Sequence, residues 1–407
     1  MRLVRTVLGG EIDRRVLPVV AVSFTYSASF STFWVYVGIF AVKGLHWPVN
    51  RVGLLFLASA PAAAVANYLS GHVSDRTGRK GLIVASFLAS ATNAVALALL
   101  GHVTAIAFAL IVVQGVIGAP AYSLDRVLVA DLVPDGEGRE HAYATVRVAT
   151  NLGALAGPPL AGLLIYLGGW TTFLLGLTTL GVAGALLTIA LLPRTGGGVA
   201  SDEEGAGTLR LVLRDRPFVL LLVSTLLAFT DYCGFETVLP VVAVSTYGVG
   251  SSTWGLLVVI SPVLVILFQL RVARASLRLP MARRLAIAIL LMGLPFLALV
   301  GSGATAVIAG VIVVFVLGEM IWAPTSQALA AEIAPAPARG TYFGALAATT
   351  GPAWTLAPFI AFQLRAHGGV ASVWVFFAAV AFVGAIAGTA ATRVALRRGA
   401  VGAAISR

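Results

Sequence analysis

Long apolar stretches occupy most of this 407-residue sequence and leave room for little besides membrane-spanning helices. A helix needs about 20 apolar residues to cross roughly 30 Å of hydrocarbon. Only 11% of the residues are charged, whereas soluble proteins average about 25%. We therefore predict an all-α integral membrane protein with twelve transmembrane helices, at residues 16–42, 51–72, 81–101, 104–132, 141–167, 170–192, 217–247, 252–273, 284–301, 304–332, 340–366 and 370–393.

Basic residues collect on one side of the predicted membrane. With both chain ends in the cytoplasm, 22 lysine and arginine residues fall on the inner side and only Lys43, Arg51 and Arg365 on the outer side. Because cytoplasmic loops carry an excess of these residues, we predict that both termini are cytoplasmic. The net charge of +11 then reflects topology, and we expect no binding to nucleic acid. We also expect no cleaved signal peptide, since the N-terminus lacks a short apolar region with a small-residue cleavage site.

A polar stretch at residues 193–216 separates two sets of six predicted spans. Its glycines and acidic residues indicate a flexible cytoplasmic linker between an N-terminal bundle, residues 1–192, and a C-terminal bundle with a short cytoplasmic tail, residues 217–407. The sequence Ala-Asp-Leu-Val-Pro at 130–134 recurs as Ala-Glu-Ile-Ala-Pro at 331–335, followed closely by an arginine in both places. Such a duplicated six-plus-six chain is typical of transporters whose halves rock about a site near the middle of the membrane.

The loop between the second and third predicted spans reads Gly-His-Val-Ser-Asp-Arg-Thr-Gly-Arg-Lys. It resembles the signature loop between helices 2 and 3 of the major facilitator superfamily of transporters, Gly-x-x-x-Asp-Arg-x-Gly-Arg-Arg/Lys. The resemblance extends over essentially the whole chain, and it implies the major facilitator fold of two pseudo-symmetric six-helix bundles. The residues at the signature positions are Gly71, Asp75, Arg76, Gly78, Arg79 and Lys80.

The resemblance also implies a role for this signature loop. Together with Asp131, at the end of the fourth span, it would form a cytoplasmic charge cluster that latches the two halves in the outward-facing state. A partly desolvated contact between aspartate and arginine can bias a two-state interface by about 1–2 kcal/mol. The simpler alternative is positive-inside topology, which explains Arg79 and Lys80 but not Asp75 or the two glycines.

Two helix patterns are similar to those of drug:proton antiporters, the multidrug efflux branch of this superfamily. The fifth span carries a Gly-x-x-x-Gly-Pro-x-x-Gly-like pattern, in which small residues permit close backbone approach and proline bends the helix; ordinary helix packing is the alternative. The fourth span carries Gln-Gly-Val-Ile-Gly-Ala-Pro from Gln114, but Ile111 stands where these antiporters have an arginine. The fifth-span residues that carry the pattern are Gly153, Gly157, Pro158 and Gly162.

Three acidic residues, Asp231, Glu236 and Glu319, fall within predicted spans, in segments that look like the acidic, cavity-facing segments of the efflux branch. Ionisable residues inside a membrane are costly, and they commonly mark proton or substrate pathways. Since a carboxyl group removed from water binds its proton more tightly, these three residues could exchange a proton for a cationic substrate. The alternative is that each only makes a hydrogen bond or ion pair between helices.

A second set of charges, Asp125, Arg126 and Arg147, lies in or near the fourth and fifth spans. Pairing among these residues is the simpler interpretation, and direct contact with substrate is the other. If either arginine lacks a partner, the pocket would suit an anionic substrate instead of a cationic one.

Aromatic residues in the spans, Tyr26, Trp34 and Trp322 among them, provide flat apolar walls that bind lipophilic molecules and attract cations. We predict a proton-coupled exporter of lipophilic, cationic or zwitterionic compounds in the bacterial inner membrane, working as a monomer by alternating access. The alternative is a transporter of one metabolite, such as a sugar, an amino acid or an anionic natural product. We expect no metal site and no cofactor, with the proton gradient as energy source. An enzyme is not expected, because the loops are short and carry no catalytic set.

Overall fold

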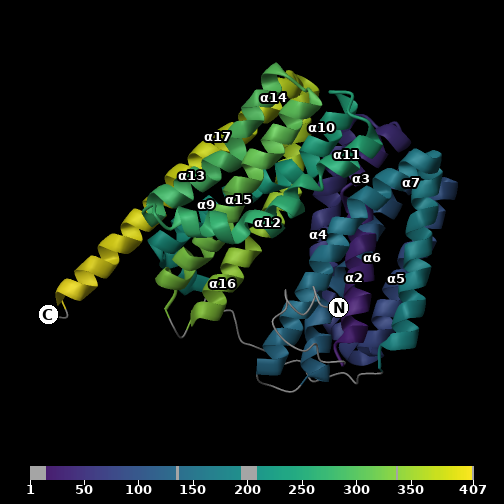
Figure 1. Ribbon diagram of the computed structural model, residues 1–407, viewed down its shortest axis with the longest axis horizontal. Helices are drawn as coiled ribbons and strands as arrows, with labels where there is room; N and C mark the ends of the chain where they lie inside the picture. The colour runs from purple at the N-terminus through teal and green to yellow at the C-terminus, as the bar shows by residue number, and fades with distance from the viewer. Residues whose placement is uncertain (1–14, 134–136, 194–208, 336–337, 406–407) are drawn as a thin grey trace. The chain divides into compact units, whose positions relative to one another are not determined.

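The computed structural model describes residues 15–133, 137–193, 209–335 and 338–405 (Figure 1). Those residues are almost entirely helical and form no β-strand. The first helices are α2 (Leu17–Trp34), α3 (Val37–Ile39), the π-helical turn η1 (Phe40–Gly44), α4 (Val49–Thr77), α5 (Arg79–Leu100), α6 (Thr104–Leu132) and α7 (Glu137–Leu191). The remaining ones are α8 (Leu209–Arg214), α9 (Arg216–Cys233), the π-helical turn η2 (Gly234–Val238), α10 (Leu239–Ser245), α11 (Ser251–Leu257), α12 (Ile260–Ser276), α13 (Met281–Gly293), the 3₁₀ turn η3 (Leu294–Leu297), α14 (Ala298–Gly301), α15 (Thr305–Ile333), α16 (Arg339–Ala348) and α17 (Thr350–Ile405).

Within the described part of the chain, seven helical stretches are long and apolar enough to cross a membrane. Two of these stretches, in α7 and α17, change direction at glycines with non-helical backbone angles, Gly168 and Gly169 in the first and Gly369 in the second. Those turns coincide with predicted boundaries between spans. The protein is thus a multi-pass helical membrane protein, and the total of twelve spans remains a prediction.

The chain divides into two compact units. The first unit comprises residues 1–47, 58–201 and 250–256, and the second comprises residues 48–57, 202–249 and 257–407. The boundary between 201 and 202 falls inside the predicted linker. Each unit also contains a short segment from elsewhere in the chain, namely the start of α11 in the first unit and the start of α4 in the second.

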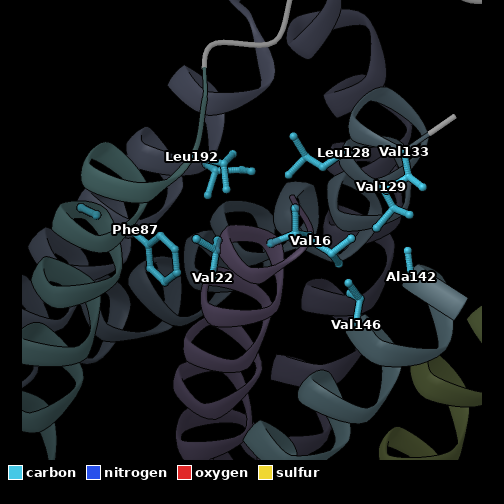
Figure 2. Close-up of a cluster of buried hydrophobic side chains, with 12 residues drawn as sticks. Val16, Val22, Phe87, Leu128, Val129, Val133, Ala142, Val146 and Leu192 are labelled. Atoms are coloured by element: carbon cyan, nitrogen blue, oxygen red, sulfur yellow. The ribbon is translucent and has the colours of Figure 1, made fainter. Parts of the chain in front are cut away.

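The first unit is built on α7, whose two limbs pack against α2 and α5, and these helices run side by side in Figure 1. At one end of the unit, buried side chains from α2, α5, α6 and α7 form an apolar cluster, with Phe87 at one edge (Figure 2). The cluster includes Val133 and Leu192, the residues that directly follow α6 and α7. Van der Waals packing of these side chains holds the helix ends together from inside.

In the second unit, α17 packs against α9 and α13, and α13 packs against α15. By contrast, the helix pair α11–α12 is largely exposed: only 6% of its most apolar 18-residue stretch is buried. Its leucines and isoleucines, such as Ile266 and Leu270, are about two-thirds exposed. An apolar helix surface of this kind is stable only against lipid.

The first helix of each unit ends in the same way. The Trp47 N–H donates to Ala41 O at 2.9 Å, and the Val249 N–H donates to Ala243 O at 3.0 Å, six residues back in both cases. Both turns need a residue with positive φ, which is His46 (φ 56°) in one and Gly248 (φ 73°) in the other. The shared geometry extends the internal repeat beyond what the sequence pattern revealed.

Candidate functional site

Three acidic residues of the second unit lie in membrane-spanning helices. Asp231 is on α9, Glu236 is in η2 directly after it, and Glu319 is on α15. Asp231 is completely buried, and neither of its carboxyl oxygens has a hydrogen-bond partner among the described residues. Glu236 and Glu319 are half-buried, and their carboxyl groups lie close enough to influence each other electrostatically. The unit therefore contains one enclosed acid and two acids that remain partly accessible.

The π-helical turn η2 explains how Glu236 comes to lie in an otherwise regular helix. The Leu239 N–H donates to Gly234 O, five residues back, which widens the helix by one residue. Pro240 follows and has no N–H to offer the Glu236 carbonyl four residues earlier, so a regular α-helical ladder cannot form there. Single π-helical turns of this type occur frequently at functional sites.

Aromatic side chains surround the two accessible acids. The Tyr232 hydroxyl lies near the Glu236 carboxyl group. The Trp322 ring packs edge-on against Phe229 with ring centroids 5.0 Å apart, and Trp354 packs in the same manner against Tyr232 at 6.3 Å. Trp322 itself is buried, and its indole N–H has no partner among the described residues. Carboxyl groups beside aromatic faces suit a lipophilic cation.

The first unit contains a pocket of a different character, which is small, with a volume of about 20 Å³. Tyr26, Phe30 and Trp34 of α2 stack in sequence along one wall, with neighbouring ring centroids 6.1 and 5.9 Å apart. None of the described residues that line the pocket is charged. They are Tyr26, Ser29, Phe30, Phe33, Trp34, Ser86, Phe87, Ser90, Gln114, Ile117 and Gly118.

A short chain of hydrogen bonds fixes the polar wall of this pocket. The Asn93 amide donates to Gln114 Oε1 at 2.7 Å, and the Gln114 amide donates to Ser90 Oγ at 2.6 Å. Asn93 is held in turn by a bond of 3.0 Å to Leu110 O. Because Ser90 accepts from Gln114, its own hydroxyl hydrogen is available to a ligand, and so is the second amide hydrogen of Gln114. The wall thus presents donors to a molecule with carbonyl or ether oxygens.

Sequence analysis missed the serines and the asparagine of this wall. Ser86, Ser90 and Asn93 are spaced four and three residues apart on α5. This spacing is the only sequence signal that they share a helix face. Ile111, which replaces the arginine of the antiporter pattern, is completely buried and does not line the pocket.

The glycine pattern of the fifth predicted span lies where α7 crosses α2. Gly153, Gly157 and Pro158 are buried. A Cβ atom at Gly157 would lie 2.7 Å from the Thr32 backbone nitrogen, and one at Gly153 would lie 3.0 Å from that of Ala28. The hydroxyl group of Thr32 donates to Gly157 O at 3.2 Å. The pattern therefore serves a close approach of two helix backbones.

Gly162, the last residue of the pattern, packs against the start of α11. A Cβ atom there would lie 3.0 Å from Ser252 O, and one at Gly255 would lie 2.7 Å from Pro158 O. The Tyr36 hydroxyl, on the next turn after α2, donates to Ser251 O at 2.7 Å. These contacts hold the first turns of α11 within the first unit.

The predicted signature loop is mostly helical, because the backbone from Gly71 to Thr77 continues α4 and Gly78 alone separates it from α5. Gly78 precedes the helix with φ 79°, a conformation that favours glycine. Arg79 is buried, and the Lys80 ammonium group donates to Ile189 O at 2.8 Å and Leu192 O at 2.5 Å, at the end of α7. A cation at the C-terminus of a helix can donate hydrogen bonds to the last carbonyl groups, and it interacts favourably with the negative end of the helix dipole. The side chains of the other predicted latch residues, Gly71, Asp75, Arg76 and Asp131, lie outside the described residues.

The predicted charges of the fourth and fifth spans are only partly described. The side chains of Asp125 and Arg126 lie outside the described residues, although their backbone belongs to α6. Arg147, on the first limb of α7, is exposed. Among the residues that the structure describes, no group of three His, Cys, Asp or Glu side chains could hold a metal ion.

Half-buried acids on apolar helices, an uncharged aromatic pocket and lipid-facing surfaces together define a membrane transporter. The family model described as Major Facilitator Superfamily matches residues 19–358, and the chain belongs to that family. Its relatives and structural neighbours are transporters, and the protein is not an enzyme.

Individual relatives are distant. The chain is 22% identical over 324 residues to a Na(+), Li(+), K(+)/H(+) antiporter of Planococcus maritimus, covering 72% of this chain and 76% of that protein. It is 20% identical over 314 residues to the uncharacterized MFS-type transporter YqjV of Bacillus subtilis (strain 168), covering 75% of both. Among solved structures, the nucleoside transporter NupG (D323A mutant) is similar with a TM-score of 0.75 and 17% identity, covering 93% of this chain and all of the other. The last likeness concerns the fold alone.

Proposed function

We infer that this protein is a secondary active transporter that exports lipophilic, cationic or zwitterionic compounds in exchange for protons, by alternating access. The carrying observation is the group of acids in the second unit, where Glu236 and Glu319 are half-buried beside the aromatic rings of Tyr232 and Trp322. A proton and a cationic substrate would compete for the same carboxyl groups. The enclosed carboxyl of Asp231 would take part only as a proton carrier, because it is out of reach of solvent.

The proposal includes the rest of the expected architecture. Twelve spans would form two six-helix bundles, residues 1–192 and 217–407, joined by the linker 193–216. Both termini would lie in the cytoplasm of a bacterium, and the protein would work as a monomer with no cofactor besides the proton gradient. The signature loop and Asp131 would latch the bundles at the cytoplasmic side.

The uncharged pocket of the first unit supports a division of labour within this mechanism. Its aromatic wall, Tyr26, Phe30 and Trp34, would take the flat apolar part of a substrate, while Gln114 and Ser90 donate to its oxygens. The acids of the second unit would bind and release protons.

The test is transport of a fluorescent lipophilic cation by purified full-length protein in proteoliposomes, with and without an imposed proton gradient. Wild-type protein should move the cation only with the gradient, Glu319→Gln should abolish gradient dependence, and Glu319→Asp should retain it because it keeps the carboxyl group. Gradient-dependent transport by Glu319→Gln at the wild-type rate would remove Glu319 from the mechanism.

A second candidate is exchange of a monovalent metal cation for protons. It is favoured by the named activity of the relative from Planococcus maritimus and by the presence of three carboxyl groups in one unit. The same proteoliposomes, loaded with a pH-sensitive dye, distinguish the two: addition of Na⁺ or K⁺ would release protons only if the metal cation is the substrate.

The third candidate is proton-coupled transport of one specific metabolite. The donors of Gln114 and Ser90 favour it, because a site with fixed hydrogen-bond donors discriminates strongly among neutral substrates. Binding of a single compound from a chemically varied panel, and of no unrelated lipophilic compound, would support this alternative.

A further inference from the structure

A groove of about 550 Å³ runs along the outer surface of the second unit, between α13 and the C-terminal limb of α17. None of the candidate transport residues lines it. Its floor is made by small side chains, among them Ala286, Ala385 and Ala390, and its apolar flanks by Leu290, Phe382 and Ile386. Phe382 and Ile386 are more than half exposed, so the groove opens toward the surroundings of the helices and not toward a protein interior.

One end of the groove is cationic. Arg393 and Arg397 line it, and both are exposed. They are four residues apart on α17 and therefore on the same helix face. The structure gives neither of them a hydrogen bond or an ion pair with another described residue.

The start of α13 adds positive charge at this same end. A Cβ atom at Gly388 would lie 2.8 Å from the Leu285 side chain and one at Gly384 3.3 Å from that of Ile289, so α13 and α17 run antiparallel. The N-terminal turn of α13, with Arg283 and Arg284, thus lies near the level of Arg393. A helix N-terminus carries about half a positive charge, which favours an anion.

The length of the groove indicates its occupant. From Phe382 to Arg393 there are 11 residues, which span about 16 Å at 1.5 Å per residue. That is half of the roughly 30 Å hydrocarbon core of a bilayer. An apolar channel as long as one leaflet is deep, with arginines at its polar end, matches a lipid with its acyl chain along the helices and its headgroup at the surface. Paired arginines suit a phosphate, and basic pockets between membrane helices bind anionic headgroups.

We propose that this groove is a binding site for an anionic phospholipid, with the phosphate on Arg393 and Arg397 and one acyl chain along Ala390, Ile386 and Phe382. The predicted topology puts the arginines on the cytoplasmic side, so the lipid would belong to the inner leaflet. The site is separate from the transport site and does not depend on the substrate proposed above.

The test is native mass spectrometry of the full-length protein in nanodiscs of defined composition, with phosphatidylglycerol titrated against phosphatidylcholine. Wild-type protein should retain phosphatidylglycerol at least tenfold more strongly than phosphatidylcholine. The double variant Arg393→Gln/Arg397→Gln should lose this preference. The matched control is Arg274→Gln/Arg278→Gln, which removes an equally spaced and exposed pair at the C-terminal end of α12. This pair does not line the groove, so the control should keep the preference for phosphatidylglycerol.

A second variant distinguishes the contribution of the groove's shape from that of its charge. Ala390→Phe fills the floor while keeping both arginines, and it should weaken phosphatidylglycerol retention to the level of the arginine double variant. Equal retention by wild type and the Arg393/Arg397 variant, or equal loss in the Arg274/Arg278 control, would overturn the proposal. So would equal retention of the two lipids by the wild type, or undiminished retention by Ala390→Phe.

Discussion

Replacing Gly157 with alanine tests the close packing of α2 on α7. The new Cβ atom would lie 2.7 Å from the Thr32 backbone nitrogen, 2.9 Å from Ala28 O and closer still to Ser31 Oγ. Two of these three neighbours are backbone atoms, so a change of side-chain rotamer cannot relieve the overlap. One helix has to move away from the other.

The expected cost follows from two opposing effects. Overpacking of a tight interface costs about 1–3 kcal/mol, whereas replacing a helical glycine with alanine gains about 0.5–1 kcal/mol. The net loss is therefore at most about 2.5 kcal/mol. A unit of 150–250 residues shifts its melting temperature by about 2–4 °C per kcal/mol, which gives a decrease of up to about 10 °C for Gly157→Ala.

The assay is thermal unfolding of the purified protein in detergent, followed by tryptophan fluorescence. The matched control is Gly310→Ala on α15, where a Cβ atom meets nothing within 4 Å and the melting temperature should stay or rise. Adding Ser31→Ala to Gly157→Ala should recover only part of the loss, because the backbone neighbours remain. If Gly157→Ala melts no lower than Gly310→Ala, the two helix backbones are not in the contact described.

Four further predictions concern single side chains. Lys80→Ala removes a cation from two carbonyls at the end of α7 and should lower the melting temperature by a few degrees, a loss of about 1–3 kcal/mol, while Lys80→Arg should lower it less. Tyr247→Phe leaves the indole N–H of buried Trp374, now bonded at 2.7 Å, without its acceptor and should cost about 1–3 kcal/mol by the same assay. His46→Gly relieves a positive φ in a non-glycine residue and should stabilise by about 0.5–1 kcal/mol; a lower melting temperature would contradict it. Asp231→Asn breaks no hydrogen bond among the described residues and should keep the melting temperature within about 2 °C while proton-coupled transport is lost in proteoliposomes.

The helical segments were predictable from the sequence because hydrocarbon imposes length and composition on a spanning helix. The turns at Gly168–Gly169 and at Gly369 fall where the apolar runs were expected to break. The glycines of α7 were also recognisable, since small residues four apart on a membrane helix indicate close packing.

Other features depend on how the helices rotate and pack, which no periodicity records. The complete burial of Asp231, in contrast to the half-burial of Glu236 and Glu319, depends on which helices pack around each residue. The hydrogen bonds from Asn93 to Gln114 cross between α5 and α6. A polar residue in one span reveals that it needs a partner but not which helix supplies it.

The double glycine in α7 has a consequence for how the protein enters the membrane. Gly168 and Gly169 reverse the chain within two residues, and a Cβ atom on Gly169 would meet nothing within 4 Å. No hydrophilic loop needs to be pulled across the lipid before the second limb can follow the first. The two limbs of α7 can therefore enter the membrane together as one helical hairpin.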